Sequence, residues 1–396
     1  MRAWSNWSRT LVLLGTLDLA PASAVAEPSS APGDSTVGRV APAHPAGGDG
    51  PPRVTGLFAN TRLGGYIEGR WAMEREAGAL TESGFELTRM ALVLATNLHQ
   101  RVQVTTEVEI EDGGEEIELE LAQADFAFRR GLGFRAGVLL VPLGKFNLAH
   151  DGPRTELPQR PVVATDLLGS ALSQPGLGVT GEFLVGAAGR LGYQGYSVTG
   201  YGSGILSSDG TRLPAGQKNF EDENNSPAWV GLIECSPGPG HSVALSGYTG
   251  AYNVHRVEGL DVDERRDVRV VVGDLDTHVG PLRFTAEGAL VGVDIPGSLN
   301  GIYASRQSGA YMELSLRFLD GWLGKGSRWT AVTRFDGVDF DRDLPGDSIR
   351  SLTFGINLRP IEESCVKLAF TRGETRDRFN NQTPTATFTL GVATYF

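Results

Sequence analysis

The sequence predicts an all-β chain that forms a transmembrane antiparallel β-barrel of about sixteen strands. Three observations lead to this fold class. Apolar residues recur at every second position, 53 of the 396 residues are glycine, and beyond the amino terminus no run of about 20 apolar residues could form a transmembrane helix. A strand with lipid on one face and water on the other must alternate with a period of two, so the three observations agree.

The amino terminus resembles a secretory signal peptide. Arg2 and Arg9 supply positive charge, Leu11–Ala20 is mostly apolar, and Ala22–Ala26 offers small residues for cleavage. We expect residues 1–26 to be a signal peptide, with a short membrane anchor as the alternative. Residues 27–60 are rich in Pro, Ala, Ser and Gly and predict a disordered periplasmic lead-in. Residues 61–396 are then the transmembrane barrel domain.

The alternation divides this domain into segments of roughly ten residues, each a predicted strand. The segments are Arg62–Ala72, Gly84–Leu98, Arg101–Ile110, Ile117–Arg129, Gly133–Val141, Leu177–Ala187, Arg190–Tyr201, Ser226–Ser236, His241–Tyr252, Asp267–Val279, Leu282–Val293, Gly309–Leu319, Arg328–Asp339, Ser348–Arg359, Ser364–Gly373 and Thr385–Phe396.

The gaps between these segments alternate between long and short. Odd gaps are long, from Met73–Ser83 to Glu374–Pro384, and even gaps are mostly tight, with Asp320–Ser327 as the widest exception. Long loops on one rim and short turns on the other are typical of an outer-membrane barrel. With an even number of strands, both termini fall on the short-turn, periplasmic side.

The longest gap, Pro142–Gly176, follows the fifth predicted strand and is therefore the third external loop. It is rich in charged residues. We expect this loop to fold inward and narrow the lumen, as the third external loop does in trimeric porins. A mobile surface loop is the alternative.

The carboxy terminus supports a membrane barrel. Phe388, Leu390 and Val392 alternate before the terminal Phe396. This aromatic end resembles the recognition signal of outer-membrane barrels, although Thr394 stands where that signal usually has a second aromatic.

Five stretches follow one another in the order found in a known porin family. They are Phe134–Leu148 (FRAGVLLVPLGKFNL), Gly176–Phe183 (GLGVTGEF), Asp274–Glu287 (DLDTHVGPLRFTAE), Trp329–Asp336 (WTAVTRFD) and Leu352–Pro360 (LTFGINLRP). Together they resemble the phosphate-selective porin O and P family. The resemblance implies a sixteen-stranded, trimeric, passive channel. The resemblance implies phosphate selectivity less strongly. Members of the family that bind phosphate have a cluster of lysines in the pore, whereas this chain has only four lysines and they are scattered.

If the apolar face of each strand meets lipid, the opposite face carries the charges of the lumen. A mid-membrane Arg on the lipid face would cost about 2–4 kcal/mol, which favours this assignment. The predicted pore-lining and constriction residues are Arg135, Lys145, Arg154, Arg160, Arg283, Arg317, Arg334 and Arg359. The arginines near short turns form either an electropositive exit for anions or an interfacial belt that positions the barrel.

Acidic residues crowd the external connections, for example Glu221–Glu223. They serve solubility or bridge divalent cations to lipopolysaccharide. Asp274, Asp276 and His278 share one strand face, and we interpret them as a hydrophilic wall. No cofactor and no metal site is predicted. Cys235 and Cys365 lie on strands far apart around the ring, which argues against a disulfide between them.

The function that follows is an outer-membrane porin of a Gram-negative-type bacterium, a passive water-filled channel for small anions or polar solutes. We expect a mild anion preference, with phosphate as one candidate, and no tight phosphate site. The expected partners are outer-membrane lipid, lipopolysaccharide and two further copies of the chain. Nucleic acid is not expected, because the formal net charge is −12. A plugged structural or adhesive barrel is the main alternative. A barrel enzyme is a weaker one, because the sequence shows no nucleophile–histidine pairing.

Overall fold

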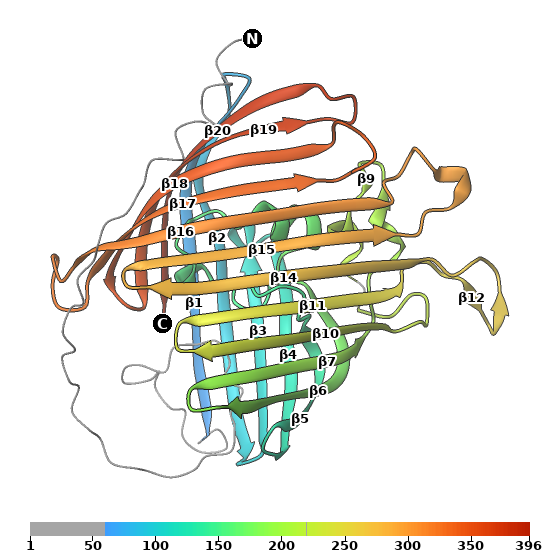
Figure 1. Cartoon of the computed structure of the whole chain (residues 1–396), viewed down its shortest axis with the longest axis horizontal. Helices are drawn as coiled ribbons and strands as arrows, with labels where there is room; N and C mark the ends of the chain where they lie inside the picture. Colours follow the sequence, from blue (N-terminus) through green and yellow to red (C-terminus); the bar gives the residue numbers. More distant parts are fainter. Residues whose placement is uncertain (1–59, 219) are drawn as a thin grey trace. The chain divides into compact units, whose positions relative to one another are not determined.

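The predicted strands pair in sequence order around one closed antiparallel barrel in the computed structural model, which describes residues 60–218 and 220–396 (Figure 1). All sixteen predicted strands are present. The barrel strands are β1 (Thr61–Glu76), β2 (Ala79–His99), β3 (Val102–Glu111), β4 (Glu116–Arg129), β5 (Leu132–Leu140), β6 (Ser173–Val185), β7 (Gly189–Val198), β10 (Ala228–Gly238), β11 (His241–Ala251), β14 (Asp267–Val279), β15 (Leu282–Val293), β16 (Arg306–Asp320), β17 (Arg328–Asp339), β18 (Ser348–Ile361), β19 (Ser364–Arg376) and β20 (Gln382–Tyr395).

The other secondary-structure elements of the described residues lie in the connections between the barrel strands. Two small hairpins occur there, β8 (Leu206–Ser207) with β9 (Gly210–Thr211) and β12 (Arg256–Val257) with β13 (Leu260–Asp261). Short helical turns are η2 (Asp112–Gly114), η3 (Gly152–Arg154), the π-helical turn η4 (Val163–Leu168), η5 (Ser203–Ile205), η6 (Leu213–Gly216) and η7 (Gly297–Leu299). Among the described residues, no helix is long and apolar enough to cross a membrane.

The last strand closes the barrel against the first. Residues of β20 pair with β1 from Tyr66↔Tyr395 to Glu76↔Thr385. Beyond the strand, the backbone N–H of Phe396 donates to the carbonyl of Gly65 at 3.0 Å, and the Gly65 N–H donates to the Phe396 carbonyl at 3.2 Å. Closure leaves neither strand with an unpaired edge, so the terminal residue takes part in the ladder as the sequence indicates.

Burial alternates along the strands with the expected period of two. On β14, Val268, Val270, Val272, Asp274 and Asp276 are buried, and the residues between them are exposed. Large apolar side chains are exposed on the other face of the wall, for example Phe354 and Phe370, at 56% and 47%. The outer face is therefore apolar and the inner face carries both apolar and charged residues.

The connections divide between the two rims as expected, with one correction. The long ones, including those with β8–β9 and β12–β13, lie at one rim, and tight turns such as Gly280–Pro281 lie at the other (Figure 1). The predicted long first gap, Met73–Ser83, is instead mostly strand. Its turn is Ala77–Gly78, whose φ values are +48° and +86°. Positive φ at both positions defines a type I′ hairpin turn, whose twist matches the strands.

The predicted signal peptide (1–26) and nearly all of the predicted lead-in (27–60) lie outside the described residues. Cys235 and Cys365 both carry free thiols.

We predict that Gly137→Ala destabilises the barrel. Gly137 on β5 has a φ of +128°, and an added Cβ would lie 2.0 Å from the carbonyl oxygen of Ala122 on β4. Backbone strain and overlap together should reduce the free energy of unfolding by at least about 2 kcal/mol, measured by urea denaturation of the refolded protein. The control is Gly273→Ala on β14, where nothing lies within 4 Å of the added Cβ. Equal stability of the two variants would contradict the close approach of β4 and β5.

Candidate functional site

The β5–β6 connection, residues 141–172, is bonded to strands on the other side of the ring. Three backbone N–H groups at its start donate to side chains of β11, β14 and β15. The pairs are Gly144 N to Ser246 Oγ at 3.1 Å, Lys145 N to Asp274 Oδ1 at 2.8 Å and Phe146 N to Glu287 Oε2 at 3.0 Å. Further along, Val162 N donates to Asp336 Oδ1 on β17 at 3.1 Å. Wall carboxylates and a serine thus serve as acceptors for this connection.

Cationic side chains of the wall bond to carbonyls of the same connection. Lys367 on β19 is 1% exposed, and its ammonium donates to Gly152 O at 2.6 Å, to Thr155 Oγ1 at 2.7 Å and to Leu157 O at 3.3 Å. Three acceptors match the three protons of an ammonium group. The buried amine is therefore fully bonded.

Two arginines of the neighbouring strands β17 and β18 act in the same way. Arg334 and Arg359 are 4% and 3% exposed. Their bonds run from Arg334 Nη1 to Gln159 O at 2.9 Å, from Arg334 Nη2 to Arg160 O at 3.2 Å, from Arg359 Nη1 to Pro153 O at 2.6 Å and from Arg359 Nη2 to Thr155 O at 3.4 Å.

The sequence of the connection explains why it needs these partners. Pro142, Pro153, Pro158 and Pro161 prevent a long helix or a strand, because proline has no N–H and fixes its φ. An irregular backbone leaves its polar groups without ladder partners, and buried N–H and C=O groups must be bonded elsewhere. The inward charges of the wall supply those bonds.

The second half of the connection is held by apolar contacts. Val163 and Leu167 of η4 lie against Gly309 of β16 and Val338 of β17. They belong to a buried apolar cluster that also includes Val268, Val270, Val272, Val291 and Val293 of β14 and β15. The alternation of single strands gave no sign of this cluster, because the partners come from the connection.

Between the first half of the connection and the wall lies a cavity that is open to solvent. Four cationic and four acidic side chains line it, so its formal charge is balanced. The cations are Lys145, Arg154, Arg283 and Arg334, and the acids are Glu156, Asp274, Asp276 and Glu313. A second cavity, toward the tight-turn rim, shares Lys145 and Asp276 with the first.

Seven of the eight predicted site residues fall into three groups by their main contacts, and Arg283 and Arg334 also line the cavity. Arg135, Arg283 and Arg317 pair with carboxylates near connections of the tight-turn rim: Arg135 with Asp125 at 2.6 Å, Arg283 with Asp276 through two bonds of 3.1 and 2.9 Å, and Arg317 with Asp320 at 2.5 Å. Arg334 and Arg359 hold the connection, as described above. Lys145 and Arg154 line the cavity, where Lys145 Nζ lies 2.7 Å from Ser242 Oγ and 3.3 Å from Asp276 Oδ2.

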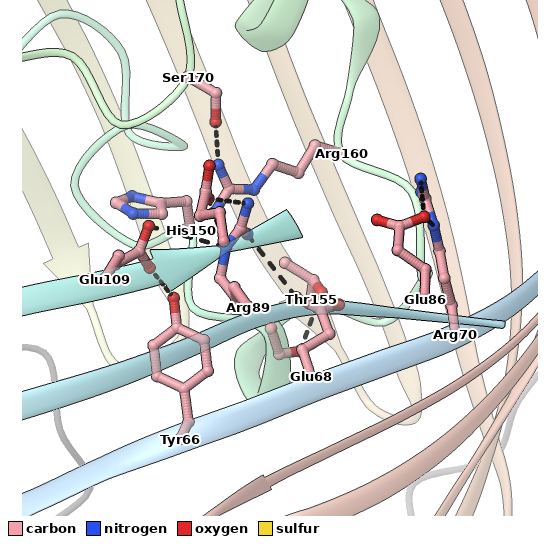
Figure 2. A network of polar contacts seen from close by, with 12 residues as sticks. Tyr66, Glu68, Arg70, Glu86, Arg89, Glu109, His150, Thr155, Arg160 and Ser170 are labelled. Atoms are coloured by element: carbon pink, nitrogen blue, oxygen red, sulfur yellow. Dashed lines mark hydrogen bonds and ion pairs between the residues drawn. The ribbon is translucent and has the colours of Figure 1, made fainter. Parts of the chain in front are cut away.

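Arg160 lies apart from the cavity, in a buried polar cluster (Figure 2). Its Nη1 donates to Ser170 Oγ. Figure 2 shows Tyr66, Arg89 and Glu109 on neighbouring strands with His150 and Arg160 of the connection beside them. Glu109, Glu120 and His150 are 2%, 3% and 3% exposed, so these ionisable groups are almost completely withdrawn from water.

Within this cluster, His150 pairs with Glu120 through Nε2. Burial lowers the pKa of the imidazole, and the adjacent Glu120 carboxylate raises it. Burial is the largest single influence, but the charge and hydrogen bond of Glu120 and the charge of Glu109 together outweigh it, so the net direction of the His150 pKa is upward.

Sequence reasoning missed Lys367, Arg89 and the association of His150 with Glu109 and Glu120. Lys367 could have been found, because it alternates with Val366 and Leu368 and so faces inward. The partners of His150 could not, since they depend on the path of the connection.

The geometry defines a closed barrel with charged cavities and a connection bonded to side chains of the wall, and comparisons with solved structures identify this as the fold of outer-membrane porins. The outer-membrane channel DcaP of Acinetobacter baumannii is 12% identical, with a TM-score of 0.56 over 85% of this chain and 97% of that one. An anion-selective porin from Comamonas acidovorans is 11% identical, with a TM-score of 0.56 over 85% and 99%. OprB of Pseudomonas putida is 9% identical, with a TM-score of 0.54 over 85% and 94%.

In sequence, the chain is 22% identical to an uncharacterized protein of Aquifex aeolicus over 325 residues, which is 75% of this chain and 72% of that protein. No protein-family model matches the chain.

We predict that Lys367→Met loosens the β5–β6 connection. The substitution keeps an unbranched side chain, shorter by one atom, but leaves the Gly152 and Leu157 carbonyls without their donor. Buried acceptors without a donor cost about 1–3 kcal/mol each, so the connection should open more often. Limited proteolysis of the folded protein should then cleave within residues 141–172 several times faster than in wild type. Lys325→Met, at an exposed position in the 321–327 turn, is the control. Equal cleavage rates in both variants would show that Lys367 is not an anchor.

Proposed function

We propose that this chain is an outer-membrane porin, a passive water-filled channel for small solutes. The observation that carries the proposal is the division of the closed wall into an apolar outer face and an inner face with charged cavities. An exposed apolar surface of this extent requires lipid, and a closed barrel leaves no unbonded strand edge in the membrane. The shared fold with outer-membrane porins supports the proposal.

The same proposal includes cleavage of a signal peptide at residues 1–26, a periplasmic lead-in at residues 27–60 and assembly as a homotrimer in contact with lipid and lipopolysaccharide. The β5–β6 connection narrows the lumen, with its charged cavity as the path for solutes.

For ion preference, we favour a mild anion preference without a tight phosphate site. The connection contributes two cations to the cavity, Lys145 and Arg154, and one acid, Glu156. Glu156 accepts a hydrogen bond from Asn357 Nδ2 at 2.6 Å, which disperses part of its charge. On the wall, Arg283 and Arg334 are already paired with carboxylates. A phosphate ion would have to compete with those carboxylates, so a phosphate preference of the kind the resemblance implies should be weak at most.

The channel itself is tested by planar-bilayer recording of the purified protein. Stepwise, voltage-independent conductance increments are expected at low voltage. A protein that inserts and gives no current would instead be a plugged structural barrel, which is the outcome that refutes the proposal.

We predict that Arg154→Ala shifts the reversal potential in a KCl gradient toward cation preference. A unit charge at about 4 Å in water contributes about 1 kcal/mol, so the anion-to-cation permeability ratio should fall by up to about fivefold. Arg317→Ala is the matched control, because Arg317 is paired with Asp320 beside the 321–327 connection and lines neither cavity. If Arg154→Ala leaves the reversal potential unchanged, the connection does not set ion preference.

We also predict that Phe396→Lys lowers the amount of protein in the outer membrane several-fold. The terminal residue completes the β20–β1 ladder, and a charged side chain there removes an aromatic anchor at the membrane interface. Phe379→Lys is the control, since Phe379 is 87% exposed in the connection between β19 and β20. Fractionated membranes should show a normal amount of that variant. Equal amounts of the two variants would contradict the role of the terminus.

A further inference from the structure

Glu109, Glu120 and His150 converge from three separate parts of the chain. Glu109 lies on β3, Glu120 on β4 and His150 in the β5–β6 connection. Each offers one ligand atom, and these atoms all lie within 4.8 Å of one another. All three side chains are at least 97% buried. The arrangement combines two carboxylates with one imidazole, which distinguishes it from a cluster of acids on the surface.

The imidazole of His150 is oriented by a backbone carbonyl. Its Nδ1 lies 2.9 Å from the carbonyl oxygen of Asn147, and a carbonyl only accepts, so Nδ1 carries the proton of this bond. Nε2 is therefore the nitrogen presented to the two glutamates. A ligating histidine characteristically donates its other ring N–H to a carbonyl or carboxylate, which fixes the tautomer that binds metal.

A β-bulge lies at Glu120, whose side chain is buried. In the β3–β4 ladder, Glu107 pairs with Leu121 and Val108 pairs with Leu119, so Glu120 is the extra residue. The polar neighbours of the Glu120 carboxylate are Nε2 of His150 and the side chain of Glu109, and no backbone N–H of the described residues donates to either of its oxygens. A buried carboxylate with so few partners is costly unless a cation is bound, and bulges often re-aim side chains at functional sites.

The third member of the cluster, Glu109, contacts Tyr66 and Arg89 as well as Glu120. Its Oε1 accepts the hydroxyl proton of Tyr66, and its Oε2 lies 3.7 Å from Nε of Arg89. Arg89 donates two hydrogen bonds to Glu111 Oε1, from Nε at 2.9 Å and from Nη2 at 2.7 Å. Its charge is therefore shared with carboxylates outside the cluster.

The charges around the cluster leave room for a dication. The cationic groups that face it are the guanidinium groups of Arg89 and Arg160, besides His150 itself. Four carboxylates face these two guanidinium groups: Glu68, Glu109, Glu111 and Glu120. With a neutral imidazole the four carboxylates and two guanidinium groups sum to a formal charge of −2, which one divalent ion would offset.

We propose that Glu109, Glu120 and His150 bind one divalent transition-metal ion, of which Zn²⁺ is the best representative, and that this ion fastens the β5–β6 connection to β3 and β4. Zn²⁺ accepts imidazole nitrogen and carboxylate oxygen together, and three protein ligands leave one position for water. Mg²⁺ and Ca²⁺ are disfavoured, because both prefer oxygen donors. Metal binding does not depend on the proposed channel function, whereas any effect of the metal on conductance rests on it.

The test uses untagged full-length protein, folded in detergent and stripped with EDTA. Titration with ZnCl₂ against a chromophoric chelator should show one saturable site per chain. Glu120→Gln and His150→Gln should each weaken binding by at least about tenfold, the lower bound expected even for a partner of a ligand. The controls are Glu313→Gln, another inward carboxylate, and His241→Gln, an exposed histidine at a tight turn. Both should bind Zn²⁺ as wild type does.

Two measurements keep the proposal testable if a variant fails to fold. His150→Cys replaces one zinc ligand by another and should retain binding that His150→Gln loses. The X-ray absorption spectrum of zinc-loaded wild type should show a single imidazole together with oxygen ligands at about 2.0–2.2 Å. Wild type without a saturable site, or equal affinity in wild type and both glutamine variants, would overturn the proposal and leave an ion pair only.

Conductance recorded with and without ZnCl₂ separates the two proposals. Zinc binding by a chain that carries no current would support the metal site and refute the channel.

Discussion

An irregular backbone inside a barrel must find hydrogen-bond partners on the wall, and this constraint accounts for the distribution of charge in the structure. Wall acids accept from N–H groups of the β5–β6 connection, and wall cations donate to its carbonyls. Lys367 shows the principle most fully, because each of its three protons meets an acceptor of the connection. Burying an ammonium group or a carbonyl without a hydrogen-bond partner costs free energy. Here the ammonium group donates to the carbonyls, so both kinds of group are bonded.

In this arrangement, cationic side chains that face the interior either bond to the connection or pair with acids of neighbouring strands. Arg334 and Arg359 are committed to the connection, and Arg135 and Arg283 to neighbouring acids. The groups that border the cavity carry equal formal charge of each sign. An inventory of inward arginines therefore overstates the positive potential of the interior, and weak ion preference is the expected consequence. Pairing also fixes the side chains, which keeps the shape of the cavity constant.

Much of the fold could be predicted from the sequence because strand alternation is a local property. All sixteen barrel strands were found in this way, and so was closure at Phe396. The first hairpin was misjudged, because Ala77–Gly78 lacks the Asn-Gly or Asp-Gly signal and its strands extend past the alternating core. The bulge at Glu120 was also invisible, since it depends on the register with β3.

The candidate site was predictable only in part, for a related reason. Alternation shows that Arg334 faces inward, but the carbonyls it bonds belong to residues some 170 positions away in the chain. The same holds for His150, whose partners lie on β3 and β4. Residue type and alternation predict which face of the sheet a side chain lies on. The residue it bonds to can be predicted only from the path of the long connection, which has no repeating pattern.

The central claim is that residues 141–172 are held rigidly by the wall, and hydrogen–deuterium exchange of the folded protein tests it most directly. Peptides that contain the amides of Lys145, Phe146 and Val162 should exchange nearly as slowly as strand peptides, because these amides are bonded to wall carboxylates. Peptides from the connection between β11 and β14, which is mostly exposed, give the fast reference. Exchange of residues 141–172 at that fast rate would contradict the account.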